Sequence, residues 1–195
     1  MPTPSNRQDL GAGRPAVFFD RDGIVNRSPG PGYVERWEDF HLLPAFLRAL
    51  RLVRAGGYAA VVVTNQRGVG RGLMSRADLD AIHARLARVL EGEGLHLDAI
   101  YACTVDDDAH PDRKPNPGML LRAARDLGLD LQRSWMIGDS ERDILAGRAA
   151  GCRTIRVAPE TEPSESDLRV ADMEALPPML ARVLERPAGT TETRV

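Results

Sequence analysis

Short apolar runs alternate with segments of helical spacing along most of this chain, and this alternation restricts the fold more than any other feature. Apolar runs of this length are typical of strands buried in a parallel sheet, and we expect strands at 16–19, 58–63, 97–103, 135–137 and 154–157. Helical spacing separates them at 44–55, from Ser75 onward, at 117–127 and at 140–150. The pattern predicts an α/β fold with a central parallel sheet and helices on both faces.

The length of 195 residues fits one domain with a sizeable core. We expect a single Rossmann-like domain over residues 15–186. Polar sequences with proline and glycine predict a flexible leader at 1–14 and a flexible tail at 187–195.

Composition narrows the classes of partner. A net charge of -2 gives no general attraction to nucleic acid or to anionic membranes. The first 14 residues lack the apolar stretch of a signal peptide, and the longest apolar run, 58–63, is too short to span a membrane. Two cysteines far apart in sequence are a poor disulfide framework. We expect a cytoplasmic monomer without membrane or nucleic-acid partners.

Polar residues follow the predicted strands where each strand ends. Asp20 follows the first strand, Thr64 the second, Arg113 and Lys114 come after the third, and Asp139 follows the fourth. Ligands of parallel α/β sheets bind beyond the carboxyl ends of the strands. We therefore expect two carboxylates, a hydroxyl and a cation at one edge of the sheet.

These side chains have the chemistry of phosphate ester hydrolysis. Asp20 supplies a nucleophile, and Asp22, two residues on, turns to the same side and supplies a general acid and base. Thr64 holds phosphate oxygens, and Lys114 neutralises charge on the transferring group. Asp20, the carbonyl of Asp22 and Asp139 offer the oxygen ligands that Mg²⁺ prefers. The sequence predicts a magnesium-dependent phosphatase with an aspartyl-phosphate intermediate.

Each motif alone has a simpler interpretation. A D-x-D-G sequence also occurs in turns and calcium loops, and Thr64 alone is typical of a strand-end cap. Lys114 beside a proline is typical of a solvated loop, and Ser140 after Asp139 is typical of a helix N-cap. The order of the motifs and their positions at strand ends favour catalysis.

The four motifs resemble those of the haloacid dehalogenase superfamily. The matching segments are Asp20-Arg21-Asp22-Gly23, Thr64, Lys114 and Gly138-Asp139-Ser140-Glu141-Arg142-Asp143. The resemblance implies that Asp20 is the nucleophile, Asp22 the general acid and base, and Asp139 a magnesium ligand. It places Asp143 outside the direct ligands or behind a water molecule. Asp22 favours phosphoryl transfer over dehalogenation.

Further segments are similar to the branch of D,D-heptose bisphosphate and histidinol-phosphate phosphatases. They are Gly32-Tyr33-Val34, Thr64-Asn65-Gln66 with Gly68-Val69-Gly70-Arg71-Gly72, and Arg113 to Met119. The resemblance implies a small phosphorylated sugar as substrate. No long insertion separates the motifs, so we expect no large cap domain, and 28–37 is a candidate flap. The implied substrate-binding residues are Arg21, Gly32, Tyr33, Thr64, Asn65, Gln66, Arg67, Arg113, Lys114 and Ser140.

The chain departs from this branch at two places. Many members carry a zinc loop of Cys-x-His and Cys-x-Cys before the third motif. Here Cys103 matches the first ligand, but Val105 replaces the histidine, and His110 and Asp112 stand at the second pair. Four well-placed ligands are the norm, so we do not expect structural zinc. Ser140 stands where heptose phosphatases often have lysine, which weakens the assignment of their substrate.

Four functions stay open. The preferred one is hydrolysis of a sugar phosphate such as D-glycero-D-manno-heptose 1,7-bisphosphate, and the second is hydrolysis of histidinol phosphate. The third is a polynucleotide 3′-phosphatase in which Arg67 and Arg71 hold the nucleic-acid backbone, although the chain is not basic overall. The fourth is a non-catalytic phosphosugar-binding protein, against which the intact Asp20 and Asp22 pair argues.

Overall fold

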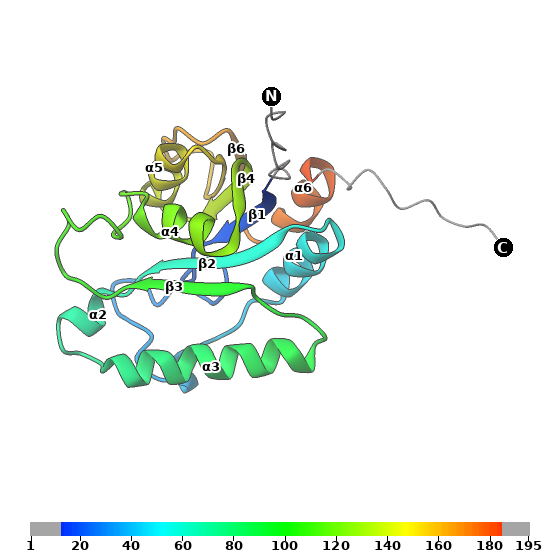
Figure 1. Ribbon diagram of the computed structural model, residues 1–195. Coiled ribbons are helices and arrows are strands. Elements are labelled where there is room, and N and C mark those ends of the chain that lie inside the picture. The colour runs from blue at the N-terminus through cyan, green and yellow to red at the C-terminus, as the bar shows by residue number, and fades with distance from the viewer. Residues whose placement is uncertain (1–12, 185–195) are drawn as a thin grey trace, which may run out of the picture.

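Six parallel strands form the centre of the part of the chain that this computed structural model describes, residues 13–184. The sheet order is β3-β2-β1-β4-β5-β6 (Figure 1). The predicted fold class is confirmed. The strands are β1 (Arg14–Phe19), β2 (Ala59–Asn65), β3 (Ala99–Cys103), β4 (Leu129–Gly138), β5 (Arg153–Val157) and β6 (Leu168–Val170).

The central strand β1 owes its place to four apolar residues in succession. Ala16, Val17, Phe18 and Phe19 have no exposed surface, as expected for a strand covered on both faces. β1 pairs with β2 on one side and with β4 on the other. In this strand order the chain connections reverse direction between β1 and β4, and that reversal point is where ligands bind in such sheets.

Alternate side chains of β1 divide the core into two layers. Val17 and Phe19 face α1 (Pro44–Ala55), α3 (Arg76–Gly92) and α6 (Leu176–Val183), whereas Ala16 and Phe18 face α4 (Gly118–Leu127) and α5 (Glu141–Ala150). Figure 1 shows these helices on both sides of the sheet. The predicted two-faced arrangement is confirmed, because each helix buries its apolar stripe against one face.

Two helices begin with capping motifs at the serine residues where the sequence predicts a helix start. Ser75 begins α3 with a capping box, in which its side chain accepts from the backbone N–H of Asp78 and the Asp78 carboxylate accepts from the N–H of Ser75. Ser140 and Asp143 form the same motif at the start of α5. The second box fixes the segment that directly follows Asp139.

Several elements were not predicted. β6 has three residues, too few for a periodic pattern, and α6 contains Pro177 and Pro178, which are tolerated only because they lie in its first turn. The short helices α2 (Arg67–Gly70) and η1 (Trp37–Asp39) also escaped prediction. β4 begins at Leu129, well before Trp135, because its first residues pair with Arg14 and Pro15 ahead of a register shift.

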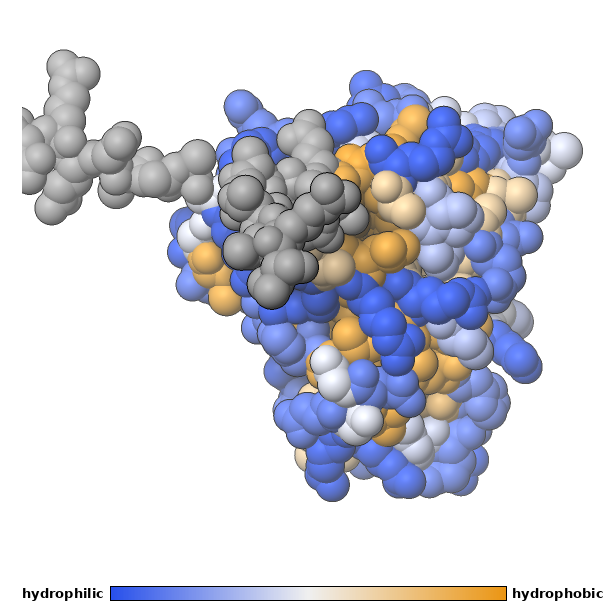
Figure 2. All heavy atoms as spheres, turned by 90° about the vertical axis from the view of Figure 1, so that its right-hand side faces the viewer, coloured by the Kyte–Doolittle hydropathy of each residue, from blue (hydrophilic) through white to orange (hydrophobic). Residues whose placement is uncertain are grey.

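The predicted leader and tail lie outside the described residues, except for Gly13 and Arg14. Arg14 is the first residue of β1. Within residues 13–184, no helix combines the length and the apolar character needed to cross a bilayer. Figure 2 shows the face on the α1 and α6 side, where hydrophobic residues emerge between hydrophilic ones.

Candidate active site

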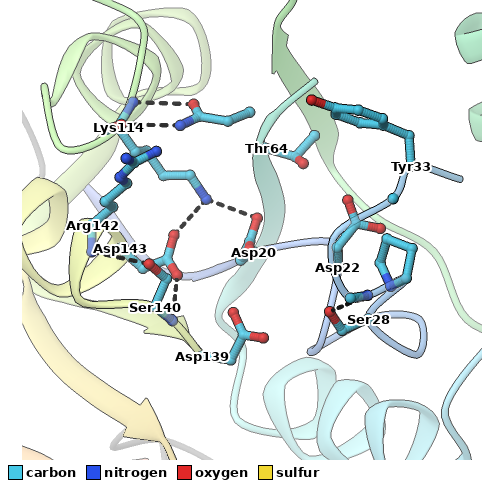
Figure 3. Close-up of a pocket in the computed structure, with 14 residues that line it drawn as sticks. Asp20, Asp22, Ser28, Tyr33, Thr64, Lys114, Asp139, Ser140, Arg142 and Asp143 are labelled. Carbon is cyan, nitrogen blue, oxygen red and sulfur yellow. Dashed lines mark hydrogen bonds and ion pairs between the residues drawn. The ribbon is translucent and has the colours of Figure 1, made fainter. Parts of the chain in front are cut away.

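A cavity of about 340 Å³ opens at the carboxyl ends of β1, β2 and β4. It contains most of the residues predicted from the strand ends. In Figure 3, Tyr33 and Ser28 lie on the side opposite Lys114 and Arg142, with Asp20 between them. The lining residues are Asp20, Asp22, Ser28, Pro29, Gly30, Gly32, Tyr33, Thr64, Asn65, Lys114, Asp139, Ser140, Arg142 and Asp143.

A tight turn after β1 brings Asp20 and Asp22 to the same cavity. The backbone N–H of Asp20 still donates to the carbonyl of Ile137 at 2.9 Å, so Asp20 is tied to β4. Gly23 then adopts a φ of 89°, which favours glycine. A Cβ at this position would lie 1.9 Å from Oδ2 of Asp139. Glycine is therefore required both by the turn and by the close approach of Asp139.

Arg21, which the resemblance implies to be a substrate-binding residue, is not among the residues that line the cavity. Its side chain is 1% exposed, and its Nη2 donates to both carboxylate oxygens of Asp22 at 2.9 Å. The guanidinium carbon lies 5.9 Å from the centre of the Phe40 ring. Asn26 Nδ2 and Gln66 Nε2 also donate to the Asp22 carboxylate, at 2.9 and 3.0 Å. Arg21 thus orients Asp22 from beneath the cavity.

Lys114 joins three parts of the site. Its ammonium lies 2.7 Å from Oδ1 of Asp20 and 2.6 Å from Oδ1 of Asp143, and it donates to the carbonyl of Val63 at 2.8 Å. Burial disfavours the ammonium form, but the carboxylates of Asp143 and Asp20 outweigh burial and raise the pKa of Lys114. The lysine therefore stays protonated as a fixed positive charge beside Asp20.

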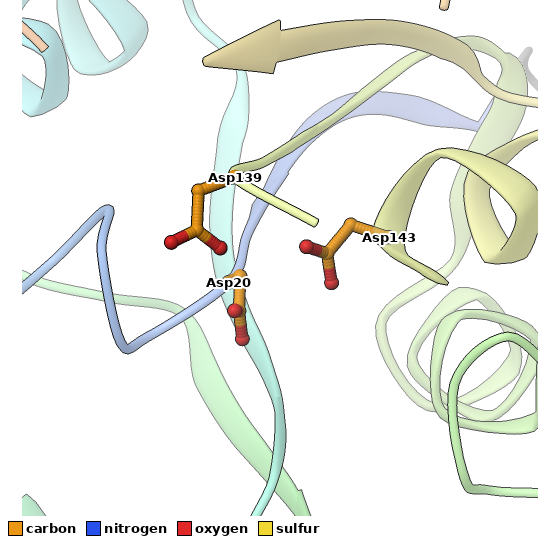
Figure 4. A group of neighbouring side chains, drawn as sticks. All are labelled: Asp20, Asp139 and Asp143. Atoms are coloured by element: carbon orange, nitrogen blue, oxygen red, sulfur yellow. The ribbon is translucent and has the colours of Figure 1, made fainter. Parts of the chain in front are cut away.

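Three carboxylates converge at the centre of the site (Figure 4). One oxygen from each of Asp20, Asp139 and Asp143 lies within 4.8 Å of the others. Burial, reinforced by the neighbouring carboxylates, raises the pKa of Asp20 to about 7 despite the opposing effect of Lys114. Burial, again with the charge of Asp143, raises the pKa of Asp139 to about 6. This excess of negative charge fits a divalent cation that takes oxygen ligands.

The carboxylate cluster differs in membership from the predicted ligand set. Asp143, predicted to lie outside the direct ligands, stands within the cluster, where Ser140 N–H and Lys114 hold its two oxygens. The carboxylate of Asp22 lies outside it and is engaged by Arg21. Its predicted part in metal binding rests on its backbone carbonyl.

The segment after β2 forms the wall of the cavity near Lys114. Thr64 lines the cavity, and its Oγ1 accepts from Gln66 Nε2 at 2.8 Å. Asn65 also lines it, and its amide exchanges two hydrogen bonds with the backbone of Lys114, at 3.0 and 3.1 Å. Gln66 stands behind the wall, where it links Thr64 to Asp22.

The candidate flap lies over the opposite rim. Gly32 and Tyr33 line the cavity together with Ser28, Pro29 and Gly30. A Cβ on Gly68 would lie 3.2 Å from the ring of Tyr33, so the flap packs closely on α2. The tyrosine hydroxyl also accepts from Arg71 Nη1 at 3.3 Å.

Two predicted substrate-binding arginines do not line the cavity, although both lie next to residues that do. Arg67 pairs with Asp106 and Asp108, and Arg113 pairs with Asp108. From sequence, the acidic segment 106–108 is typical of a solvated loop that could repel polyanions or bind a loose cation, and its pairing with these arginines was not predicted. The contact between Arg67 and Asp108 joins residues 41 positions apart in the chain, so no local sequence pattern predicts it.

The start of α5 contributes two residues to the cavity lining, of which one was predicted from sequence and the other was not. Ser140 lines the cavity, but its hydroxyl accepts from the backbone N–H of Arg142 as a helix cap. Arg142 lines the cavity with its own side chain (Figure 3). Its position in the first turn of a helix that begins at the sheet edge is the signal that would have identified it.

The residues of the altered zinc loop are already engaged with one another and with the protein. Cys103 Sγ lies 3.9 Å from His110 Nδ1, and the same nitrogen accepts from the backbone N–H of Asp112 at 3.2 Å. The Asp112 carboxylate pairs with Arg122 at 2.5 Å. Cys103, His110 and Asp112 therefore make contacts that hold this loop against the rest of the protein.

Known proteins resemble the chain over most of its length. Residues 112–181 match the family model described as HAD-hydrolase-like. D-glycero-alpha-D-manno-heptose-1,7-bisphosphate 7-phosphatase of Burkholderia mallei is 40% identical over 151 residues, which span 71% of this chain and 77% of the relative. D-glycero-D-manno-heptose-1,7-bisphosphate 7-phosphatase of Thermosynechococcus vestitus is 40% identical over 158 residues, 74% of this chain and 79% of the relative.

A solved structure extends the similarity to the fold. D,D-heptose 1,7-bisphosphate phosphatase from B. bronchiseptica, complexed with magnesium and phosphate, superposes with a TM-score of 0.76 at 33% identity. The match covers 86% of this chain and 98% of the other. Combined with the four motifs at one sheet edge, these similarities mean that the chain is a phosphatase of the haloacid dehalogenase superfamily and belongs with its heptose bisphosphate phosphatases.

Proposed function

We propose that this phosphatase removes a phosphate from a heptose bisphosphate, in a magnesium-dependent reaction through an aspartyl-phosphate intermediate. The observation that carries the proposal is the position of Asp20, 2.7 Å from the Lys114 ammonium and within one cluster with Asp139 and Asp143. A nucleophile, a fixed cation and a set of metal ligands thus meet in one cavity. The names of the similar proteins supply the substrate class.

Asp20 acts as the nucleophile. Its carboxylate attacks the phosphorus, a bond forms between its oxygen and phosphorus, and the bond to the sugar oxygen breaks. Lys114 stays protonated and keeps a positive charge 2.7 Å from Oδ1 of Asp20. That charge reduces the repulsion between the Asp20 carboxylate and the substrate phosphate, and it orients the attacking carboxylate.

Asp22 handles the protons of both half-reactions. It gives a proton to the departing sugar oxygen and then takes one from the water that attacks the aspartyl-phosphate. Arg21, Asn26 and Gln66 hold the carboxylate from three sides. Because these donors come from beneath the cavity, the Asp22 carboxylate has one defined orientation toward the reacting group.

Thr64 and Asn65 form the phosphate-binding wall. Thr64 presents its hydroxyl to the cavity, and the side chain of Asn65 fixes the backbone of Lys114 on the same wall. A phosphate held there has the Thr64 hydroxyl and the Lys114 ammonium within the same lining.

Asp20, Asp139 and Asp143, with the carbonyl of Asp22, are the groups that would hold Mg²⁺. The raised pKa values of Asp20 and Asp139 support this assignment, because a cation relieves the cost of keeping both carboxylates charged in a buried site. When bound, the ion supplies charge that offsets repulsion between the nucleophile and the phosphate.

The substrate assignment follows the relatives, and the anomer is a separate question. The relative from Burkholderia mallei is named for the alpha anomer, whereas one from Mesorhizobium japonicum, at 39% identity, is named for the beta anomer. A cavity of about 340 Å³ is in the range for a small metabolite.

A phosphate-release panel with Mg²⁺ tests the proposal. The panel contains both anomers of D-glycero-D-manno-heptose 1,7-bisphosphate, other sugar phosphates, histidinol phosphate, nucleotides and a 3′-phosphorylated oligonucleotide. We expect the highest kcat/KM for one heptose anomer. A preference for histidinol phosphate or for the oligonucleotide would overturn the substrate assignment.

The variant Asp20→Asn tests the mechanism in the same assay. It should fold normally and lose turnover, whereas Asp80→Asn, on the exposed face of α3, should keep the wild-type rate. Comparable turnover in Asp20→Asn would overturn the nucleophile assignment.

A further inference from the structure

Two arginine side chains beside the cavity share one carboxylate oxygen. Arg113 Nε donates to Oδ1 of Asp108 at 2.8 Å, and Arg67 Nη2 donates to the same oxygen at 2.6 Å. Arg113 directly precedes Lys114, and Arg67 lies two residues after Asn65, which lines the cavity. The shared carboxylate therefore stands next to the wall that we assign to phosphate binding.

The two sides of this contact differ in exposure. The side chain of Arg113 is 3% exposed and that of Arg67 is 23% exposed, whereas the side chain of Asp108 is 71% exposed. A buried guanidinium needs a permanent anionic or hydrogen-bonding partner, because an unpaired buried charge is costly. An exposed carboxylate turns into solvent at little cost. The arginines are thus the fixed part of the contact, and the Asp108 carboxylate is the exchangeable part.

The backbone around Asp108 is anchored independently of the arginines. Asn116 Nδ2 donates to the carbonyls of Asp108 and His110, at 3.3 and 3.0 Å. A Cβ on Gly70 would lie 2.5 Å from the carbonyl oxygen of Thr104, so the end of α2 packs directly on this loop. Rotation of the Asp108 side chain alone withdraws its carboxylate from both guanidiniums, while Arg67 keeps its ion pair with Asp106 and Arg113 keeps its hydrogen bond to the carbonyl of Val105.

Arg142 adds a further positive charge at the cavity. Arg142 lines the cavity from the first turn of α5. The hydrogen bond from Arg113, together with the charges of Arg67 and Arg142, lowers the pKa of Asp108. Asp108 therefore stays anionic near neutral pH, and it occupies a place where two contacting guanidiniums favour an anion.

We propose that Asp108 competes with the second anionic group of the substrate for Arg67 and Arg113. When a bisphosphate binds, its second phosphate displaces the Asp108 carboxylate from the two guanidiniums. A phosphate offers several acceptor oxygens to the paired guanidiniums, whereas Asp108 offers them a single shared oxygen. This inference rests on the proposed function, since a second anionic subsite matters only for a doubly phosphorylated substrate. Asp108 thereby sets the selectivity between bisphosphates and monophosphates.

The variant Asp108→Asn tests the proposal, because asparagine keeps the Oδ1 acceptor and removes the charge. Asp107→Asn is the matched control: it removes the same charge from the same loop, and the Asp107 carboxylate accepts only a local bond from the N–H of Ala109 at 2.9 Å. The measurement is the ratio of kcat/KM for heptose 1,7-bisphosphate to kcat/KM for heptose 7-phosphate. We expect this ratio to rise three- to tenfold in Asp108→Asn and to change less than twofold in Asp107→Asn.

An equal change in both variants would overturn the proposal, since it would reflect general loop charge. A lower ratio in Asp108→Asn would also overturn it, because Asp108 would then only position the arginines. If the wild type hydrolyses neither heptose phosphate, the proposed function fails, and calorimetric binding of inorganic phosphate tests the subsite by itself. If inorganic phosphate binds three- to tenfold more tightly to Asp108→Asn than to Asp107→Asn, the result supports the subsite. Equal binding of phosphate by the two variants would rule the subsite out.

Discussion

The ammonium of Lys114 lies 2.6 Å from Oδ1 of Asp143, and both side chains are buried, with exposed fractions of 3% and 1%. Asp143 comes from the first turn of α5, whereas Lys114 comes from the loop before α4. The second oxygen of Asp143 accepts from the backbone N–H of Ser140 at 3.0 Å, which fixes the carboxylate. The ion pair therefore determines where the charge of Lys114 stands relative to Asp20.

The variant Asp143→Asn should damage activity more than stability. Asparagine keeps an acceptor for the Ser140 N–H, but Lys114 loses one of its two carboxylate partners and the metal cluster loses a charge. We expect kcat/KM to fall about 10- to 100-fold and the Mg²⁺ concentration for half-maximal rate to rise. The free energy of unfolding should fall by about 2 kcal/mol. Steady-state kinetics with Mg²⁺ titration and urea denaturation measure these effects.

The control for this variant is Ser75→Ala, which removes the cap of α3 far from the carboxylate cluster. It should cost about 1 kcal/mol of stability and leave the kinetics unchanged. Equal loss of activity in the two variants would mean that Asp143 acts only through the stability of the fold.

The metal-free protein should lose stability as the pH rises from about 4 to 7. Folding raises the pKa of Asp20 from 3.8 to about 7 and that of Asp139 from 3.8 to about 6, mainly through burial. The folded state therefore binds more protons than the unfolded state in this window, so stability falls as the pH increases. The slope for one group is at most about 1.4 kcal/mol per pH unit. Urea denaturation in EDTA across this range measures it.

The difference between wild type and Asp20→Asn isolates the contribution of Asp20. The variant should gain stability relative to wild type as the pH rises through 7 without metal, and Mg²⁺ should reverse the order. A difference that stays constant between pH 4 and 8 would contradict the inferred crowding of carboxylates.

The positions of Asp20, Thr64, Lys114 and Asp139 were predictable because each follows a recognisable element of a parallel sheet. The carboxyl ends of such strands meet at one edge, so recognising the strands was enough to collect these residues. No distances were needed for that inference. The same reasoning explains why the fold class was predictable although β6 and α6 were not.

Contacts between loops were beyond such reasoning. The pairing of Asp108 with Arg67 joins segments 41 residues apart, and its geometry depends on how α2 packs on a loop. The burial of Arg21 is a different case. The alternation that places Asp22 beside Asp20 turns the residue between them the other way, so its position could have been inferred from the backbone pattern.

Arg21→Lys should lower kcat and leave KM nearly unchanged. Lysine keeps the positive charge but lacks the planar guanidinium, which now contacts both oxygens of Asp22. Loss of orientation in the proton-transferring carboxylate should cost on the order of 10- to 100-fold in kcat. Steady-state kinetics with a sugar phosphate measures the split. A raised KM with unchanged kcat would instead indicate that Arg21 contacts the substrate.

Gly23→Ala should weaken metal binding beyond what its effect on stability explains. An added Cβ would lie 1.9 Å from Oδ2 of Asp139, so the carboxylate must leave its present position. Gly151→Ala is the matched control, because Gly151 has a φ of 87°, close to the 89° of Gly23, and no atom within 4 Å of the added Cβ. Both variants should lose about 1 to 2 kcal/mol of stability from the left-handed backbone alone.

Only Gly23→Ala should raise the Mg²⁺ concentration for half-maximal rate, by about 10-fold or more, since it alone moves a proposed ligand. Titration of the rate with Mg²⁺, together with thermal unfolding in EDTA, separates the two effects. Equal Mg²⁺ dependence in both variants would mean that displacing the Asp139 carboxylate does not affect metal binding. The assignment of Asp139 as a ligand that depends on Gly23 would then fail, because the distance of 1.9 Å leaves the carboxylate no room to stay in place.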